Sequence, residues 1–398
     1  MIGRISPKRP AIEVTIARLD RSGDGLGIDE GGMRHVVPGT LPGERVMART
    51  RRRVRGHYWS QLVEVIDPSP MRVTAPCRAY GEGCGGCQLQ HLSLEHQRGL
   101  KRAFIEERLA TSDGIALPDR IDVVYLEPWH FRTTLRVGVD AAGAAGFRKR
   151  RTHHVIGGSA CEVAHPLLNE LLVTGRYVGA DEVTLRCGDR TGERLALAAP
   201  KVDRLEVPPD VRSDFIHEVA AGRRWRISAQ SFFQSRPDAV DVMGELVAEA
   251  ALEVDGPRAA LDLYSGVGVF AGVLADTGWA VTSVESAPSA VADAQVNLAG
   301  DEVTIVSADV GQWRPTPASL VVADPSRIGV GRDGCAVIAS SGARRVVLIS
   351  CDVTGLTNDA RSLVRAGYEM TTMSIIDVFP HTFHVEIVST FDKVRGAS

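Results

Sequence analysis

The stretch ALDLYSGVG at residues 260–268 is the clearest guide to the fold. Its apolar first half predicts a buried strand, and its glycines allow a ligand to approach the backbone where the next helix begins. In open α/β sheets, such turns lie at the carboxyl ends of strands, where ligands bind. The stretch therefore predicts a strand, a glycine loop and a helix within an α/β domain.

A second predicted strand, residues 280–285, ends in an acid, Glu285. Asp262 and Glu285 lie 23 positions apart, near the spacing at which an acidic residue reaches a ribose diol. The glycine turn lacks the G-x-G-x-x-G fingerprint, because Phe270 and Ala271 occupy the region of the third glycine. The pattern therefore favours S-adenosylmethionine over a dinucleotide.

Two further predicted strands follow, and the second leads into a cysteine. Residues 319–323 precede Asp324, and the run RVVLISCD at 345–352 places Cys351 at the end of a buried strand. A thiol at this edge of a sheet suits a nucleophile. A small buried side chain is the other interpretation, and the stretch alone leaves both open.

The composition is that of an ordinary globular protein. The 398 residues are 44% hydrophobic and 24% charged, enough for two or three domains. We find no secretory signal and no apolar run of membrane-spanning length, so we expect a cytoplasmic protein. The net charge of −3 hides an uneven distribution: residues 1–70 carry 12 basic and 8 acidic residues, a balance of +4, which leaves −7 for the remainder.

The N-terminal region resembles a small β-barrel. Short strands are expected at residues 13–19, 34–38, 43–49 and 58–66, with residues 67–70 as a linker. Five arginines between positions 49 and 55 precede Tyr58 and Trp59, and a second basic run occupies residues 148–151. A basic cluster beside aromatics is typical of RNA binding, and a solvated charged face is the alternative.

A cysteine array follows the barrel. Cys77, Cys84 and Cys87 form C-x6-C-x2-C, and Cys161 is the best candidate for a fourth ligand. Dense thiols in a chain of cytosolic type indicate a metal centre rather than disulfides. Their spacing leaves an iron–sulfur cluster and a four-cysteine zinc site both open.

Several motifs together resemble known families. GDGLG at 23–27, VVPG at 36–39 and LPGE at 41–44 resemble a TRAM domain, an OB-like RNA-binding module. FQ at 233–234, LYSGVG at 263–268, DPSR at 324–327, ISCD at 349–352 and DVFPHTFHVE at 377–386 resemble the bacterial RNA uracil-5-methyltransferase family. That resemblance extends over nearly the whole chain.

The family resemblance implies an α/β protein with three parts. We expect a TRAM/OB-like barrel at 8–68, a central α+β domain at 72–236 and a Rossmann-like S-adenosylmethionine-dependent methyltransferase domain at 237–398. It further implies a [4Fe–4S] cluster on Cys77, Cys84, Cys87 and Cys161, and cofactor binding by Gln234, Tyr264, Gly266, Glu285 and Asp324. An RNA partner, rRNA in preference to tRNA, and a monomeric state complete the expectation.

The same resemblance implies a covalent mechanism. Cys351 adds to uracil C6, Asp324 orients the base, and Glu386 removes the C5 proton. Asp352, beside the thiol, is expected to oppose its ionisation. The chain departs from the family pattern at Ser326, at Asp352 and at Ser235-Arg236, which puts the shape of the base pocket in question.

Two other functions remain as alternatives. RNA cytosine-5 methylation uses the same covalent logic, but Cys351 is not preceded by proline. A non-catalytic RNA-binding protein that retains the fold is disfavoured by the complete set of Cys351, Glu386 and Asp324.

Overall fold

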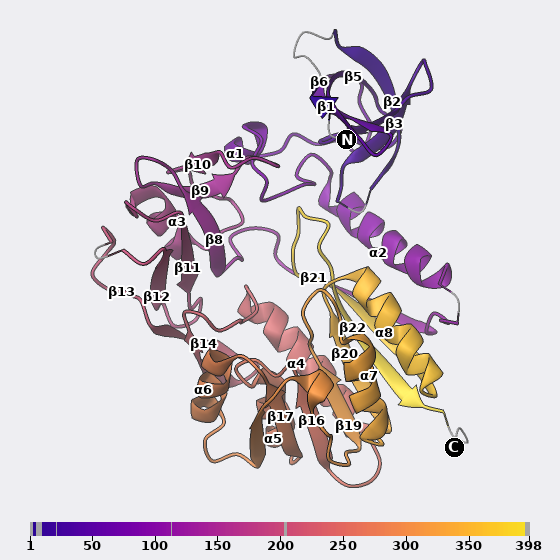
Figure 1. Cartoon of the computed structure of the whole chain (residues 1–398), viewed down its shortest axis with the longest axis vertical. Helices are drawn as coiled ribbons and strands as arrows, with labels where there is room; N and C mark the ends of the chain where they lie inside the picture. The colour runs from indigo at the N-terminus through magenta and orange to yellow at the C-terminus, as the bar shows by residue number, and fades with distance from the viewer. Residues whose placement is uncertain (1–2, 5–9, 21, 113, 203–204, 395–398) are drawn as a thin grey trace. The chain divides into compact units, whose positions relative to one another are not determined.

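The computed structural model describes residues 3–4, 10–20, 22–112, 114–202 and 205–394 (Figure 1). The chain divides into two compact units, which we describe separately. The first comprises residues 1–101, 147–154 and 379–383, and the second comprises 102–146, 155–378 and 384–398. These units cut across the boundaries expected near positions 72 and 237, so the three-domain division stays a prediction. Among the described residues, no helix has the length and apolar character needed to cross a bilayer.

The first unit contains the expected barrel. Strands β2 to β6 close on themselves, because β5 pairs with both β2 and β6, and β1 extends the edge at β5. Val14, Ile16, Val37, Val46 and Ala48 fill its interior. The bounds in this unit are β1 Gly3–Arg4, β2 Ile12–Leu19, β3 Gly25–Asp29, β4 Arg34–Val37, β5 Arg45–Val54, β6 His57–Asp67 and the short helix α1 Arg78–Gly81; α2, Leu94–Ala110, runs on into the second unit.

One strand of the barrel was not expected from the sequence. Residues 25–29 form β3, directly after a turn at Ser22–Gly23. A Cβ on Gly25 would lie 1.9 Å from the Thr40 hydroxyl, and one on Gly27 would lie 2.3 Å from the Thr15 carbonyl. The glycines therefore allow the close approach of backbones in a small barrel.

The expected linker at 67–70 also packs against the barrel. Ser69 is buried, and its backbone N–H donates to the Glu44 carboxylate at 3.2 Å. Arg72 donates to the same carboxylate at 2.6 and 2.8 Å. A fully buried acid needs such partners, so this segment is part of the barrel's structure.

The first part of the second unit contributes strand β7 to the large sheet described below, and it also contains two smaller sheets and one helix. Two sheets are formed, one in the order β10-β9-β8-β11-β12-β13 and one from β14 and β15. The bounds are β7 Arg120–Tyr125, β8 Thr134–Val139, β9 Ala145–Arg148, β10 Val155–Gly157, α3 Pro166–Thr174, β11 Glu182–Cys187, β12 Arg194–Ala199, β13 Val211–Arg212, β14 Phe215–Ala220 and β15 Arg223–Ser228.

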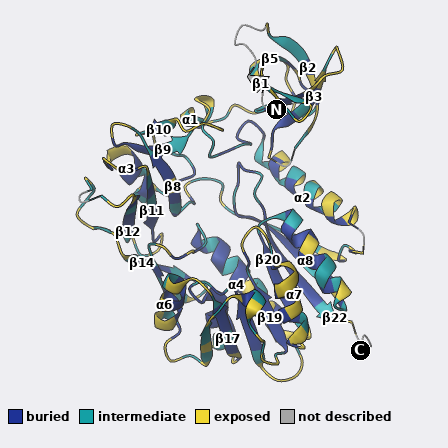
Figure 2. Ribbon diagram, in the orientation of Figure 1, coloured by how far each residue is buried: buried dark blue, intermediate teal, exposed yellow. Residues whose placement is uncertain are grey.

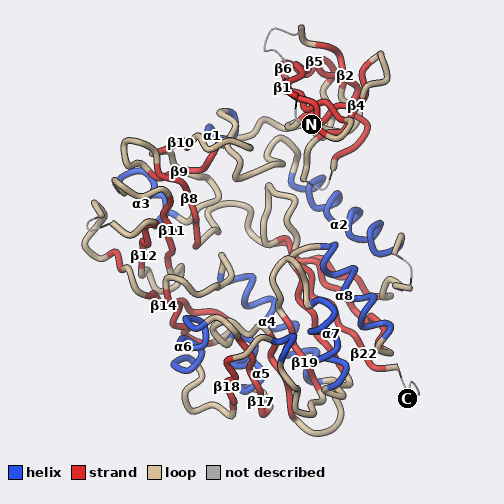
Figure 3. The backbone as a smooth tube through the Cα atoms, in the orientation of Figure 1, coloured by secondary structure: helices blue, strands red, loops and turns tan. Residues whose placement is uncertain are grey.

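From residue 237 onward, helices and strands alternate around an eight-stranded sheet (Figure 3). Its order is β18-β17-β16-β19-β20-β22-β21-β7, with β16 to β20 parallel and β22 antiparallel to both neighbours. This is the expected Rossmann-like arrangement. The bounds are α4 Pro237–Leu252, β16 Ala259–Leu263, α5 Val269–Asp276, β17 Ala280–Glu285, α6 Pro288–Asn297, β18 Val303–Ser307, the 3-10 turn Val310–Gln312, β19 Leu320–Ala323, α7 Gly331–Ser340, β20 Arg345–Ser350, α8 Val353–Arg365, β21 Tyr368–Asp377 and β22 Glu386–Lys393.

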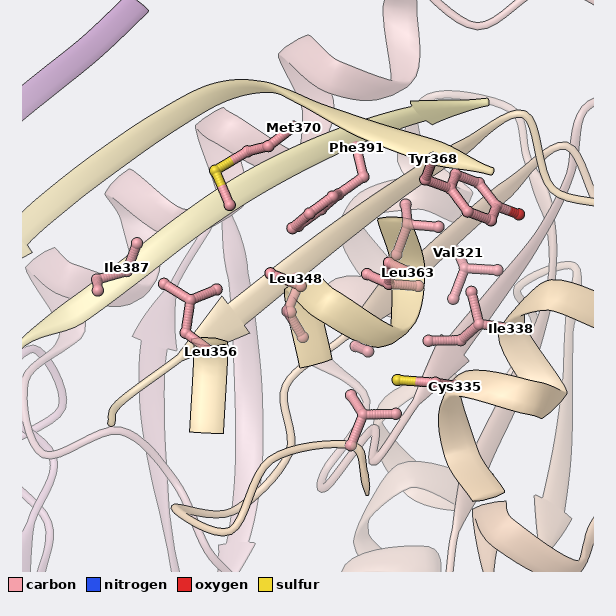
Figure 4. Close-up of a cluster of buried hydrophobic side chains, with 14 of the residues drawn as sticks. Val321, Cys335, Ile338, Leu348, Leu356, Leu363, Tyr368, Met370, Ile387 and Phe391 are labelled. Atoms are coloured by element: carbon pink, nitrogen blue, oxygen red, sulfur yellow. The ribbon is translucent and has the colours of Figure 1, made fainter. Parts of the chain in front are cut away.

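The sheet is covered on both faces, and its central strands β16, β19, β20 and β22 are buried (Figure 2). Leu348 on β20 and Ile387 on β22 face Leu356 and Leu363 of α8 and Ile338 of α7 in one apolar cluster (Figure 4). On the opposite face, side chains of α4 line a groove together with residues of β21 and β22. Burial on both faces explains why these strands are continuous apolar runs in the sequence.

Candidate active site

The glycine loop after β16 has the backbone shape that its sequence predicts. Gly266 and Gly268 have φ of 55° and 96°, and Tyr264 also lies at positive φ, 59°. A Cβ at Gly268 would lie 2.6 Å from a Leu298 methyl group. The chain therefore turns sharply into α5 with backbone N–H groups near the strand end, a geometry suited to a polar ligand.

Asp262, the acid within β16, holds this loop in place. It is fully buried and accepts a hydrogen bond from the Ala271 backbone N–H at 2.8 Å. Burial, together with the nearby charges of Asp324 and Glu285, raises the pKa of Asp262 to about 8. The side chain thus ties the first turn of α5 to the strand.

Glu285 occupies the position expected for the ribose-binding acid. One carboxylate oxygen accepts from the Gly266 N–H at 3.0 Å, and the other accepts from the N–H groups of Ser286 and Ala287, both at 2.7 Å. These bonds fix the orientation of the carboxylate at the end of β17. The Glu285 carboxylate is therefore hydrogen-bonded directly to the glycine loop.

The other expected cofactor residues meet in one cavity. Gln234, Tyr264, Gly266 and Asp324 all line it, together with Phe232 and Phe233. The Gln234 amide donates weakly to the Asp324 carboxylate at 3.4 Å, and the Tyr264 hydroxyl donates to the Val330 carbonyl at 3.2 Å. Positions far apart in the sequence thus line a single cavity beside the strand ends.

The segment that carries Gln234 is clamped by two buried residues that the sequence analysis missed. Arg186, on β11, donates to the carbonyls of Ser228 and Ser231 at 3.0 and 2.9 Å. Asp293, on α6, accepts from the N–H and hydroxyl of Ser228 at 2.7 and 2.8 Å and from the Ser231 hydroxyl at 2.6 Å. No sequence signal identifies this clamp, because its members are separated by 42 to 65 positions.

Cys351 lies immediately after β20, half-buried at the same edge of the sheet. Because Ser350 pairs with Ile387, the antiparallel register places Cys351 beside Glu386, the first residue of β22. Burial and the charges of Glu386 and Asp324 raise the pKa of the Cys351 thiol to about 12, while Arg327 opposes them. The candidate nucleophile is therefore a neutral thiol in the free protein.

Glu386 and Asp324 form a pair of acids beside this thiol. Glu386 is only 2% exposed, and among the described residues its Oε1 atom has no hydrogen-bond partner. Burial and the Asp324 charge raise the pKa of Glu386, with Arg327 opposing, and burial raises the pKa of Asp324 to about 7. Buried acids with raised pKa values are candidates for proton transfer.

The role expected for Asp352 is wrong. Its carboxylate caps α8, accepting from the backbone N–H groups of Thr354 at 2.8 Å and Gly355 at 3.1 Å. The acids that oppose ionisation of Cys351 are instead Glu386 and Asp324. The carboxylate of an aspartate directly before a helix hydrogen-bonds to the backbone N–H groups of the first helical turn. This capping role is not evident from the position of Asp352 next to Cys351 in the sequence.

We expect replacement of Asp352 by alanine to destabilise the protein by about 1 kcal/mol, since it removes a helix N-cap. Asp352→Asn should retain most of that stability, because asparagine caps almost as well. Urea unfolding of the two variants measures the difference. Equal stability of Asp352→Ala and the wild type would contradict the capping role.

The cysteine array lies in the first unit, except for Cys161. Cys77 and Cys87 are buried, and the Gly86 N–H donates to Cys84 Sγ at 3.4 Å. Burial and the nearby Cys77 raise the pKa of Cys84. Within the described part of the chain, no three His, Cys, Asp or Glu side chains are arranged to hold a metal ion. The structure thus brings Cys77 and Cys84 close together, but the residues that it describes present no assembled metal site.

Comparison with known proteins places the chain in a family, although no family model matches it. An uncharacterized RNA methyltransferase of Streptomyces avermitilis is 33% identical, covering 96% of this chain and 98% of the relative. The 23S rRNA (uracil(1939)-C(5))-methyltransferase RlmD of Chromohalobacter salexigens is also 33% identical, covering 97% and 90%. In fold, the chain is similar to Pyrococcus abyssi tRNA (uracil-54, C5)-methyltransferase in complex with S-adenosyl-L-homocysteine, with a TM-score of 0.75, 22% identity and coverage of 96% and 100%. The full-length relatives show that the chain belongs to the RNA uracil-5-methyltransferase family.

Proposed function

We propose that this protein methylates C5 of a uridine in RNA, using S-adenosylmethionine and a covalent adduct on Cys351. The observation that carries the proposal is the meeting of Cys351, Glu386 and Asp324 at one sheet edge. The cavity lined by Gln234 and Gly266 includes Asp324, so the cofactor pocket and the acid pair share a residue. Relatives named for rRNA and tRNA substrates support RNA, and the full-length rRNA relatives favour rRNA.

The residues present fit an S-adenosylmethionine site. Glu285 presents an oriented carboxylate suited to a ribose diol, and the glycine loop leaves room for a ligand at its backbone. Bound S-adenosylmethionine supplies an electrophilic methyl group. Phe232 and Phe233 add an apolar wall to the same cavity.

The chain's own residues account for the remaining steps. Cys351 gives its proton to water and its sulfur bonds to uracil C6, so that the electrons of the C5=C6 bond form an enolate that is nucleophilic at C5. C5 then takes the methyl group, which leaves S-adenosylhomocysteine as the other product, and C5 now carries both the methyl group and its original hydrogen. Glu386 removes that proton, the C5=C6 bond re-forms, and the C6–S bond breaks to release Cys351. Asp324, which lines the cavity of the glycine loop and lies near Cys351 and Glu386, orients the uracil edge.

The direct test is an incubation with labelled S-adenosylmethionine and undermodified rRNA or tRNA, followed by digestion to nucleosides. We expect labelled 5-methyluridine, with more product from rRNA. Labelled 5-methylcytidine would instead support the cytosine alternative. Failure of every RNA to yield a methylated nucleoside would overturn the proposal.

The raised pKa values predict a pH dependence. Cys351 and Glu386 both act in their deprotonated forms, and burial raises the pKa of both groups. We therefore expect kcat/KM to rise with pH between about 6 and 9, with a slope of at least one in a logarithmic plot. Single-turnover rates at saturating S-adenosylmethionine measure this slope. A flat profile would show that neither group loses a proton in the rate-determining step.

We also propose that Cys77, Cys84, Cys87 and Cys161 hold a [4Fe–4S] cluster. The dense thiol spacing, the effect of Cys77 on the Cys84 pKa and the Gly86 N–H bond to the Cys84 sulfur support it, because cluster sulfurs accept backbone hydrogen bonds. Anaerobically purified protein should be brown and contain iron, which Cys84→Ser should reduce. A colourless protein with zinc and no iron would support the zinc alternative and overturn the cluster.

A further inference from the structure

Asp359, on α8, is a buried acid with no role in the proposed reaction steps. Its side chain is 1% exposed, and each carboxylate oxygen accepts one backbone hydrogen bond from the segment before α7. The Val330 N–H donates at 2.7 Å and the Gly331 N–H at 2.9 Å. These donors belong to residues 327–331, which we call the arginine loop. Asp359 therefore holds the backbone of the arginine loop from another helix.

The arginine loop packs so closely against α8 that two glycines are needed at the contact. A Cβ on Gly329, whose φ is 83°, would lie 2.4 Å from Asp359 Oδ2. A Cβ on Gly355, in the first turn of α8, would lie 3.1 Å from the Arg327 carbonyl oxygen. Because neither residue has a side chain, the backbone of the loop lies directly against the helix. The position of the arginine loop is therefore set by α8.

The arginine loop carries a charge that acts on the candidate nucleophile. Burial raises the pKa values of Cys351 and Glu386, and the charge of the exposed Arg327 side chain opposes that rise. Helix α8 begins at Val353, two residues after Cys351. One helix thus sets the position of the thiol and of the loop that brings a cation near it.

The arginine loop is also bonded to a residue of the cavity at the glycine loop. The Val330 carbonyl accepts the Tyr264 hydroxyl at 3.2 Å, and Tyr264 lines that cavity. Burial and the Asp359 charge raise the pKa of Tyr264 to about 12, so the hydroxyl keeps its proton and can donate. Val330 is thus bonded to Asp359 through its N–H and to Tyr264 through its carbonyl. A single residue of the loop connects the buried carboxylate to the cavity.

We propose that Asp359 is a positioning residue for methyl transfer. Its carboxylate fixes the arginine loop, which holds Arg327 near Cys351 and keeps Val330 within reach of Tyr264. The inference rests on the proposed roles of Cys351 and of the cavity as the S-adenosylmethionine site. A role limited to stability, as a cap on α7, would leave cofactor affinity and thiol reactivity unchanged when Asp359 is replaced.

The first test is the affinity of the RNA-free full chain for S-adenosylmethionine, measured by calorimetric titration. Asp359→Asn keeps the shape but offers one acceptor oxygen to two N–H donors, so the arginine loop should shift. We expect the dissociation constant to rise about 3- to 10-fold, as for the loss of the Tyr264 hydrogen bond. Tyr264→Phe should cause a rise of similar size, and the double variant should bind no more weakly than Tyr264→Phe. Asp333→Asn, an exposed aspartate in the first turn of α7, is the charge-matched control and should bind like the wild type.

The second test is the rate at which iodoacetamide alkylates Cys351 at about pH 8, because the thiolate is the reacting form. Mass spectrometry of the Cys351 peptide measures this rate separately from the other thiols. We expect Arg327→Gln to slow alkylation about 3- to 10-fold in the wild type and to have little further effect in Asp359→Asn. Gly329→Ala, which forces a side chain against the Asp359 carboxylate, should behave like Asp359→Asn in both tests.

These measurements need neither RNA nor turnover, so they test Asp359 even if no RNA yields a methylated nucleoside. The proposal requires both changes. A wild-type dissociation constant, or a full effect of Arg327→Gln in Asp359→Asn, would overturn it even if 5-methyluridine forms. A lower melting temperature as the only change would assign Asp359 to stability alone. If Asp359→Asn fails to fold, the same two measurements on Gly329→Ala decide the question.

Discussion

Replacement of Cys351 by alanine is expected to abolish methyl transfer, with a loss of about 10⁴-fold or more in kcat. The loss is large because uracil C5 stays a poor nucleophile unless a group adds at C6, and no other thiol follows β20. Cofactor affinity should be unchanged, since Cys351 does not line the cavity of the glycine loop. Initial rates with labelled S-adenosylmethionine, together with calorimetric titration of the cofactor, measure both effects.

The matched control is Cys335→Ala. Cys335, on α7, is 3% exposed within the apolar cluster, and burial raises the pKa of its thiol to about 12, as for Cys351. Its removal should leave kcat intact. A turnover of Cys351→Ala comparable to that of the wild type would exclude Cys351 as the nucleophile.

Replacement of Glu386 by glutamine should slow turnover about 10²- to 10⁴-fold and trap the enzyme on its RNA. Glutamine has nearly the same shape but cannot accept the C5 proton. The methylated adduct then forms but cannot eliminate, so Cys351 stays bonded to C6. A protein–RNA complex that survives denaturing electrophoresis and carries the labelled methyl group is the expected product.

Two further variants test that interpretation. The double variant Cys351→Ala/Glu386→Gln should form no stable complex, because it lacks the bonding sulfur. Glu369→Gln changes an exposed glutamate of β21 and should behave like the wild type. If Glu386→Gln turns over normally and leaves no trapped complex, another group removes the proton.

Local sequence patterns predicted most of the sheet. The apolar runs before Asp324 and Cys351 are strands β19 and β20, and the glycine loop turns into α5 as expected. These patterns depend on residues that are close to one another in the sequence, so they can be recognised without knowledge of the tertiary structure. Strand β3 was missed for the opposite reason: Gly25 and Gly27 are needed there because segments distant in sequence approach them closely in the folded barrel.

The electrostatics of the site could not be predicted in the same way. Asp352 is next to Cys351 in sequence, yet it caps α8. Glu386 is 35 positions away, yet of the nearby charges it raises the Cys351 pKa most, second only to burial itself. The effect of one charged group on the pKa of another depends on their distance in space and on their burial. The number of residues between them in the sequence predicts neither quantity.

The sequence by itself therefore determined the family resemblance, the strand–loop–helix units and the identity of the candidate chemical groups. Only the tertiary structure decided which groups meet. Strand β22 runs antiparallel between β20 and β21, and that order alone sets Glu386 beside Cys351 at the carboxyl edge of the parallel strands. Likewise, only folding brings Arg151 over Trp59. Periodicity encodes which face of a strand is buried, but strand order depends on the packing of the whole sheet.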